Sequence, residues 1–363
     1  MKRYSLPQFL AITKEQQLPL IGKNSILYAE QFDRSQLDHY CKVADACRII
    51  HKTDAGADLL ASLLRHRTAL NFFVQPSSRT FLSFSAAQTI LGMRRMSLRD
   101  LKISSMSKGE SLVDSIRTFM SYVDMIVMRH EDENAVKAAF WISWNSERRL
   151  LVGDGEQMVP IVSGGAGTEE HPTQALLDVY TLQKSFDQHG GIAGKTIMMV
   201  GDLKRGRTVR SLSYMMRHYP GVRLIFAAPD RYQMSADVCT FLDLHSIPYS
   251  CVDSIDDGIK DADAVYMTRI QDEWDGLAAS DGHVATPERF RFGLRHLDML
   301  KQSGCLLHPL PKRDEIDEAV DYSGDGRVVY WRQERNGMWM RVAIIAALFK
   351  ADAAILAHAY PIH

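Results

Sequence analysis

Short polar segments stand at the ends of apolar, strand-like runs in this 363-residue chain. The first is SSRT, from Ser77 to Thr80, between the strand-like LNFFV and the helical pattern FLSFSAAQTILG. This placement directs backbone N–H groups, hydroxyls and the guanidinium of Arg79 to one point. Such a set suits a phosphate, because a helix start carries positive potential and arginine can donate two hydrogen bonds to one anion. The plain alternative is an ordinary Ser/Thr helix cap beside a surface arginine.

Two further polar groups follow later in the first half of the chain. Arg129 ends the strand-like run DMIVMR, at the carboxyl edge of a sheet, where α/β proteins bind ligands. HPTQ opens a helical pattern, with Pro172 in its first turn. His171 and Gln174 are three residues apart, so they share a helix face and could hold a carbonyl oxygen and an NH2 group. The plain alternatives are a surface ion pair for Arg129 and a helix cap with a half-buried histidine.

The second half offers two arginines after strand-like runs. GDLKRGRT follows TIMMV and places Arg207 at a helix start, but its glycine spacing is not the G-x-G-x-x-G of dinucleotide sites. TRIQ follows DAVYM and offers Arg269 and Gln271. Arginines at the ends of two strands of one sheet could hold two carboxylates. Either arginine singly could also be structural.

Apolar runs of strand length alternate with helical patterns, which favours α/β units around largely parallel sheets. We expect two doubly wound domains, each with a mainly parallel sheet, joined by a crossing helix that starts at His171. The glycine-rich segment Ser163–Glu170 marks the boundary. The first domain would comprise residues 1–170 plus 341–363, with the C-terminal helix packing back on it, and the second 171–340. The remaining expected strands are VPIVSG, RLIFAAP, YSCVD and CLLHPLP.

Composition narrows the class of protein. Hydrophobic residues make up 46% of the chain and the formal net charge is -1, which favours an ordinary soluble protein without a nucleic-acid or membrane partner. Polar residues interrupt the N-terminal apolar run, so we expect no signal peptide. The five cysteines form no C-x-x-C pair, so we expect buried free thiols, no metal site and a cytoplasmic location.

The ordered motifs resemble those of the transcarbamoylase family. The family's carbamoyl-phosphate signature is seen as SSRTFLSF and its second motif as HPTQALLD. The aspartate-specific branch adds GDLKRGRTVRSL, YMTRIQ, HPLPKRDEI and RNGMWMRVAIIAALF, all in the family order. A segment similar to the family's active-site loop is present as SSMSKGESLVDS, from Ser104 to Ser115. The resemblance covers the chain from about Ser77 to the last helix.

The resemblance implies a role for each matching residue. The phosphate of carbamoyl phosphate would be bound by Ser77, Ser78, Arg79, Thr80 and Arg129. Its carbonyl would be polarised by Thr80, Arg129 and His171, and its NH2 group held by Gln174 and the carbonyl of Leu310, with Leu310–Pro311 a cis peptide. The two carboxylates of aspartate would go to Arg207 and to Arg269 with Gln271. Ser104 and the catalytic Lys108 would come from the neighbouring subunit of a homotrimer. No metal or organic cofactor would be needed, because positioning two anions and neutralising charge suffices.

Within the family, the sequence favours aspartate over ornithine as acceptor. The ornithine branch has HPCQ, an SMG motif and HCLP, whereas this chain has HPTQ, no SMG and HPLP. Four positions depart from the family's common pattern, so the way in which the two domains close is an open question. They are Gln75, Phe81, Ser85 and Trp274. Three alternatives stay open: another amino-acid acceptor, a silent paralogue acting as a binding subunit and, more distantly, a dinucleotide-dependent oxidoreductase. Regulatory chains are neither required nor excluded.

Overall fold

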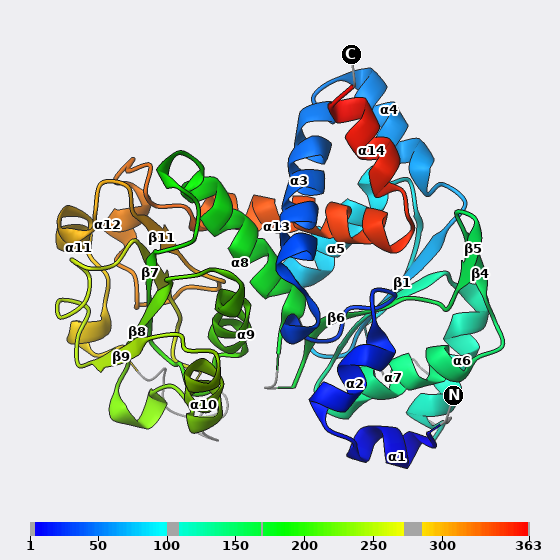
Figure 1. Ribbon diagram of the computed structural model, residues 1–363, viewed down its shortest axis with the longest axis horizontal. Coiled ribbons are helices and arrows are strands. Elements are labelled where there is room, and N and C mark those ends of the chain that lie inside the picture. The colour runs from blue at the N-terminus through cyan, green and yellow to red at the C-terminus, as the bar shows by residue number, and fades with distance from the viewer. Residues whose placement is uncertain (1–3, 100–108, 168–169, 272–284, 362–363) are drawn as a thin grey trace. The chain divides into compact units, whose positions relative to one another are not determined.

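The chain forms two compact units, each with its own sheet. The computed structural model describes residues 4–99, 109–167, 170–271 and 285–361 (Figure 1). One unit comprises Met1–Thr173 with Gly337–His363, and the other comprises Gln174–Asn336. The chain passes between them within two helices, α8 (Pro172–Ser185) and α13 (Tyr330–Leu348). The sequence-based boundaries at 170/171 and 340/341 lie close to both crossings.

A four-stranded parallel sheet organises the first unit. Its order is β2-β1-β3-β6, and parallel pairing places the carboxyl ends of β1, β3 and β6 at one edge. Nearly all residues of these three strands are buried, as expected for strands covered on both faces. The strands are β1 (Thr68–Phe73), β2 (Arg94–Leu98), β3 (Met125–His130) and β6 (Ile161–Ala166). The connecting helices are α5 (Ser78–Ile90), α6 (Leu112–Tyr122) and α7 (Glu133–Asn145).

Segments from both ends of the chain complete this unit. Helix α14 packs on α3, and His39 Nε2 lies 2.6 Å from Asp352 Oδ2. The single C-terminal helix expected from the sequence is wrong, because the backbone turns at Lys350 (φ 55°) and separates α13 from α14. The remaining elements are α1 (Leu6–Ala11), α2 (Lys14–Ile21), α3 (Arg34–Ile50), α4 (Asp54–Leu63), β4 (Leu150–Val152), β5 (Gly155–Gln157) and α14 (Asp352–Ala359).

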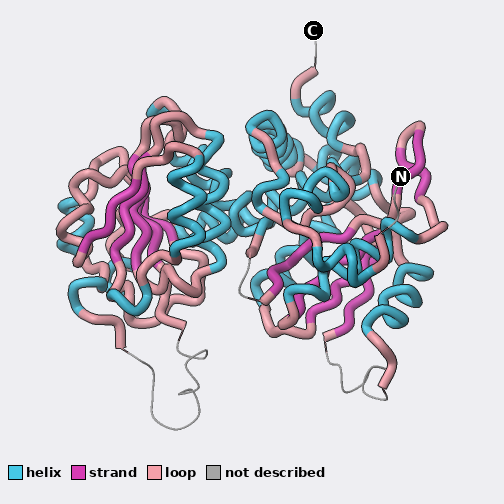
Figure 2. The backbone as a smooth tube through the Cα atoms, turned by 60° about the horizontal axis from the view of Figure 1, so that its bottom comes forward, coloured by secondary structure: helices cyan, strands magenta, loops and turns pink. Residues whose placement is uncertain are grey.

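A five-stranded parallel sheet organises the second unit, in the order β11-β10-β7-β8-β9. Figure 2 shows the strands of each unit running side by side with helices around them. Buried side chains such as Met198, Val265 and Phe290 form its core. The strands are β7 (Thr196–Val200), β8 (Arg223–Ala227), β9 (Tyr249–Val252), β10 (Ala264–Met267) and β11 (Cys305–Leu307). The helices are α9 (Arg207–Met215), α10 (Ala236–Leu244), α11 (Leu294–Met299) and α12 (Glu318–Asp321).

The glycine-rich segment expected near the domain boundary begins within the sheet, because Ser163–Ala166 is the buried end of β6 and pairs with β3. Cys251 is exposed and Cys239 half-buried, so the expectation of buried thiols holds for the other three cysteines alone. Within the described residues, no single helix is long and apolar enough to span a membrane, although the bent pair α13 and α14 meets that test by length and composition.

Candidate active site

The SSRT segment begins α5, immediately beyond the carboxyl end of β1. Ser77 is the N-cap residue in an extended conformation, yet its side chain makes no capping hydrogen bond within the described residues. Ser78 and Arg79 are exposed, and Thr80 is buried. The predicted helix start is therefore confirmed, whereas the ordinary serine cap is not seen. The hydroxyls and the first N–H groups of α5 lie together at this edge.

Arg129 lies at the same edge of the same sheet. Its carbonyl accepts hydrogen bonds from the N–H groups of Val74 (3.1 Å) and Gln75 (3.4 Å). The backbone just before SSRT is therefore hydrogen-bonded to the end of β3. Arg129 Nη1 donates to the carbonyl of Gly164 at 2.9 Å, and the side chain is buried. A buried guanidinium held in this way is pre-oriented for an anion. The structure thus brings Arg129 and Ser77–Thr80 together as predicted.

The unusual residues of α5 have local packing partners. Phe81 meets Phe73 edge-to-face at 5.5 Å, and the guanidinium of Arg99 lies 4.5 Å from the Phe81 ring centroid. Asn71 Nδ2 donates to Ser85 Oγ at 3.3 Å. Phe81 therefore takes part in an aromatic and a cation–π contact, and Ser85 in a neutral hydrogen bond.

His171 and Gln174 stand at the start of α8, as HPTQ predicts, and both side chains are buried. His171 Nδ1 lies 3.5 Å from Thr173 Oγ1. Gln174 Nε2 donates to Asp178 Oδ1 at 3.0 Å, one helical turn further on. Because its NH2 end is engaged, Gln174 presents its carbonyl oxygen as an acceptor.

Sequence reasoning missed Asp178, the last residue of HPTQALLD. Its side chain is fully buried and also accepts hydrogen bonds from Tyr266 Oη at 2.7 Å and Gln333 Nε2 at 2.7 Å. Burial raises the pKa of Asp178 to about 7, and the hydrogen bonds from Tyr266, Gln333 and Gln174 act in the opposite direction. The available signal was its i,i+4 spacing from Gln174.

We predict that Asp178 makes stability fall with rising pH. An unfolded aspartate has a pKa of about 3.9, so the folded chain binds the extra proton between about pH 4 and pH 7. The stability from Asp178 is therefore fully present below about pH 4 and is lost as pH rises through about 7. At about 1.4 kcal/mol per pKa unit, wild type should lose about 3 kcal/mol relative to Asp178→Asn between pH 5 and pH 8. Urea unfolding of both proteins at the two pH values measures this, and equal pH slopes would contradict it.

In the second unit, Arg207 is the first residue of α9, and a loop joins this helix to the end of β7. This loop is shaped by the fully buried Asp202, which sequence reasoning also missed. Asp202 accepts hydrogen bonds from Arg205 Nε at 2.8 Å and from the Gln271 N–H at 3.1 Å. The GDLKRGRT and TRIQ segments are thereby joined, as expected if they serve one ligand.

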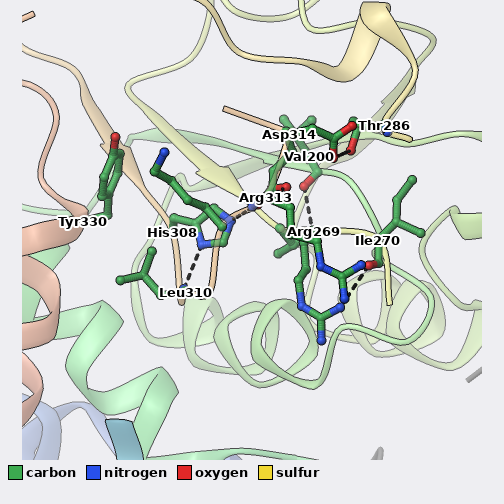
Figure 3. Close-up of polar contacts among 12 residues, drawn as sticks. Val200, Arg269, Ile270, Thr286, His308, Leu310, Arg313, Asp314 and Tyr330 are labelled. Carbon is green, nitrogen blue, oxygen red and sulfur yellow. Dashed lines mark hydrogen bonds and ion pairs between the residues drawn. The ribbon is translucent and has the colours of Figure 1, made fainter. Parts of the chain in front are cut away.

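Arg269 follows β10, the neighbour of β7 in the sheet. Figure 3 shows its guanidinium beside Ile270, whose carbonyl accepts a hydrogen bond from Arg269 Nη1 at 3.1 Å. Close approach of the two strand ends requires glycine at position 201 (φ +113°), because a Cβ there would lie 2.0 Å from the carbonyl oxygen of Thr268. The two predicted arginines thus follow two adjacent strands of one sheet, Arg269 directly after β10 and Arg207 at the start of the helix after β7.

The HPLP segment follows β11 and is held by His308. The Leu310 N–H donates to His308 Nδ1 at 2.7 Å (Figure 3). On the other side of the ring, His308 Nε2 lies 2.6 Å from Glu315 Oε1. Both His308 and Glu315 are buried. The predicted cis peptide between Leu310 and Pro311 is confirmed.

Three of the residues singled out in the sequence cannot be placed in the structure. Ser104, Lys108 and Trp274 lie outside the described residues. In the part of the chain that the structure describes, no group of three or more His, Cys, Asp or Glu side chains could hold a metal ion. The described polar groups are instead suited to bind anions and amides.

Comparison with known families agrees with this arrangement. Residues 24–184 match the carbamoyl-P binding domain of aspartate/ornithine carbamoyltransferase, and residues 193–348 match its Asp/Orn binding domain. The chain belongs to the aspartate/ornithine carbamoyltransferase family. The two matched domains correspond closely to the two units of the fold.

Individual relatives point to the aspartate members of the family. The chain is 33% identical over 325 residues to the chloroplastic aspartate carbamoyltransferase of Oryza sativa subsp. japonica, which covers 89% of this chain and 84% of that protein. It is 35% identical over 330 residues to the multifunctional protein CAD of Squalus acanthias, covering 91% of this chain and 14% of that protein. Trypanosoma cruzi aspartate transcarbamoylase, solved with carbamoyl phosphate and aspartate, superposes with a TM-score of 0.75 at 33% identity, covering 90% of this chain and 96% of that one.

Proposed function

We propose that this chain is the catalytic chain of an aspartate carbamoyltransferase. It transfers the carbamoyl group of carbamoyl phosphate to the α-amino group of L-aspartate, which yields N-carbamoyl-L-aspartate and phosphate, in pyrimidine biosynthesis. The observation that carries the proposal is the placement of Arg207 and Arg269 after the adjacent parallel strands β7 and β10. Two arginines at one sheet edge complement the two carboxylates of aspartate, with Gln271 assisting Arg269. An ornithine side chain would bring a positive charge to the same place.

The first unit binds carbamoyl phosphate. Ser77, Ser78, Arg79 and the start of α5 receive the phosphate, and the unused capping position of Ser77 supports this role. Arg129, already oriented by Gly164, neutralises the phosphate from the end of β3. Holding this dianion in place fixes the carbonyl carbon for attack.

Transfer is then an acyl substitution. The aspartate amine attacks the carbonyl carbon, its oxygen takes up negative charge, and Thr80, Arg129 and His171 stabilise that charge. The carbonyl oxygens of Gln174 and Leu310 accept hydrogen bonds from the carbamoyl NH2 group and fix its orientation. The carbonyl bond re-forms as the C–O bond to phosphate breaks, the phosphate leaves with the bonding electron pair, and it takes up the proton that the amine loses.

The relatives support the choice of acceptor. Trypanosoma cruzi aspartate transcarbamoylase has been solved with carbamoyl phosphate and aspartate, and also with N-(phosphonacetyl)-L-aspartic acid. Incubating the purified chain with carbamoyl phosphate and a panel of amino acids, with colorimetric detection of carbamoyl products, tests the proposal. We expect carbamoyl-aspartate from aspartate and none from ornithine. Product from another acceptor would favour that member of the family, and no product from any acceptor would favour a silent binding subunit.

We further propose a homotrimer whose sites are shared between subunits, with Ser104 and Lys108 supplied by the neighbour. The exposed Leu82 and Met96, on α5 and the edge strand β2, support a subunit contact on this side of the first unit.

Complementation tests the shared site. Inactive Arg79→Ala and inactive Lys108→Ala chains should regain activity when dissociated, mixed and reassembled, because a mixed trimer can hold a site with both wild-type residues. With random mixing, a minority of sites is restored, so the activity should reach a fraction of wild type. Each variant reassembled alone is the control, and verified mixed trimers without activity would count against sharing.

We also propose a reducing, cytoplasmic location for the enzyme. The five free cysteines support it, whereas the rice relative is named chloroplastic. Cell fractionation with an antibody to the chain decides between the two compartments.

A further inference from the structure

The carboxylate of Asp178 is fully buried, and its residue lies within α8, one turn after Gln174. Asp178 accepts three hydrogen bonds: from Gln174 Nε2 at 3.0 Å, from Gln333 Nε2 at 2.7 Å and from Tyr266 Oη at 2.7 Å. The two amides share Oδ1, while the phenol binds Oδ2. All four residues belong to the second unit, and three different elements, α8, α13 and β10, supply them.

The same network continues to the HPLP segment. Gln333 Oε1 accepts a hydrogen bond from the His308 N–H at 2.9 Å. His308 in turn accepts the Leu310 N–H at its Nδ1, 2.7 Å away. A chain of hydrogen bonds thus runs from Gln174 through Asp178, Gln333 and His308 to Leu310; it is buried up to His308 and partly buried at Leu310.

The hydrogen-bonding chemistry of this network fixes the orientation of the Gln174 and Gln333 side-chain amides. A carboxylate oxygen only accepts hydrogen bonds, so both glutamines must turn their NH2 ends toward Asp178 Oδ1. Gln174 then presents its carbonyl oxygen away from Asp178, and Gln333 presents its own to the His308 N–H. If Asp178 is protonated on Oδ2, Oδ1 still accepts, so the orientation is kept in both protonation states.

Keeping an acid here costs stability. Its pKa is raised to about 7 by burial, so ionisation near neutral pH is opposed by the surrounding core. An asparagine would offer the same Oδ1 acceptor without that cost. A positioning role that uses Oδ1 alone therefore predicts that asparagine can replace this aspartate.

We propose that Asp178 is a positioning residue that sets both acceptors of the substrate's NH2 group, the carbonyl oxygens of Gln174 and Leu310. This inference rests on the proposed carbamoyl transfer and adds a residue to it. Asp178 does not touch the reacting atoms; it acts through the glutamine amides. Misplacing an orienting group by about 1 Å can cost on the order of 10²-fold in rate.

Three variants in the full chain separate positioning from packing. Asp178→Ala removes the acceptor, and we expect kcat to fall about 10- to 100-fold, with KM for carbamoyl phosphate changing less than about threefold, because the phosphate is held by other residues. Asp178→Asn keeps Oδ1 and should retain kcat within about fivefold of wild type. Tyr266→Phe removes the hydrogen bond to Oδ2 and leaves both amide hydrogen bonds to Oδ1 in place, so it should lower the thermal midpoint while kcat stays near wild type.

Several results would overturn the inference. Wild-type kcat in a folded Asp178→Ala protein would do so, as would equal losses in Asp178→Ala and Asp178→Asn, or a loss in Tyr266→Phe as large as in Asp178→Ala. If Asp178→Ala fails to fold, Gln333→Met provides the test: it breaks the link to His308 at similar volume, and unchanged kcat there rejects the relay to Leu310. Turnover of the wild-type protein is measured first. If wild type forms no carbamoyl-aspartate, the proposed function itself is wrong, and this result differs from every variant outcome above.

Discussion

Replacing Arg79 with alanine should lower kcat/KM for carbamoyl phosphate by about 10²- to 10³-fold or more while leaving the fold intact. Removing one pre-oriented donor that faces developing charge costs about that much in enzymes, and Arg79 contributes charge as well as hydrogen bonds. Its side chain is exposed at the start of α5, beside the hydroxyls of Ser77 and Ser78. The core residues of α5, among them Phe84, stay buried without it, so we expect little change in thermal midpoint.

Steady-state kinetics and thermal unfolding of Arg79→Ala give the answer together. Arg34→Ala is the matched control, because Arg34 is an exposed arginine of the same unit whose Nε lies 2.9 Å from Asp38 on α3. The control should keep wild-type kinetics. Wild-type turnover in a folded Arg79→Ala protein would remove Arg79 from the phosphate site.

Buried parallel strands were predictable because burial on both faces makes them continuous apolar runs. LNFFV and DMIVMR became β1 and β3, and TIMMV became β7. The edge strand β2 was missed, since Arg94–Leu98 (RRMSL) is almost wholly exposed and has no apolar pattern. The break at Lys350 was missed because both flanking helices are apolar; it depends on a single positive φ.

The candidate ligand-binding residues were easier to predict than the residues that support them. Arg129 lies near the end of β3, Arg269 follows β10 and Arg207 begins the helix after β7, and such placement alone suggests a role. Asp178 and Asp202 act through partners far apart in sequence: Asp178 reaches Gln333 on α13, and Asp202 reaches the Gln271 N–H. Sequence spacing carries no information about such contacts until the sheet order is known.

Replacing Arg269 with alanine should impair the use of aspartate selectively. Arg269 follows β10 and Arg207 begins the helix after the adjacent strand β7, and we propose one arginine for each carboxylate of aspartate. Removing one partner of a desolvated charge pair typically costs about 2–5 kcal/mol. That corresponds to roughly a thirtyfold to several-thousandfold loss in kcat/KM for aspartate. Carbamoyl phosphate binding should change little, because the proposed phosphate site lies in the first unit.

The competing explanation is that Arg269 only stabilises its own loop, where its Nη1 donates to the Ile270 carbonyl at 3.1 Å. In that case the variant would lose thermal stability with no selective loss for aspartate. Arg295→Ala is the matched control: it removes an exposed arginine of the same unit that pairs with Asp256 at 2.8 Å, and its kinetics should stay normal. Arg269→Lys keeps the charge but not the planar, two-pronged donor, so it should fall between wild type and Arg269→Ala in aspartate use. Normal aspartate kinetics in Arg269→Ala would refute the assignment and reopen the identity of the acceptor.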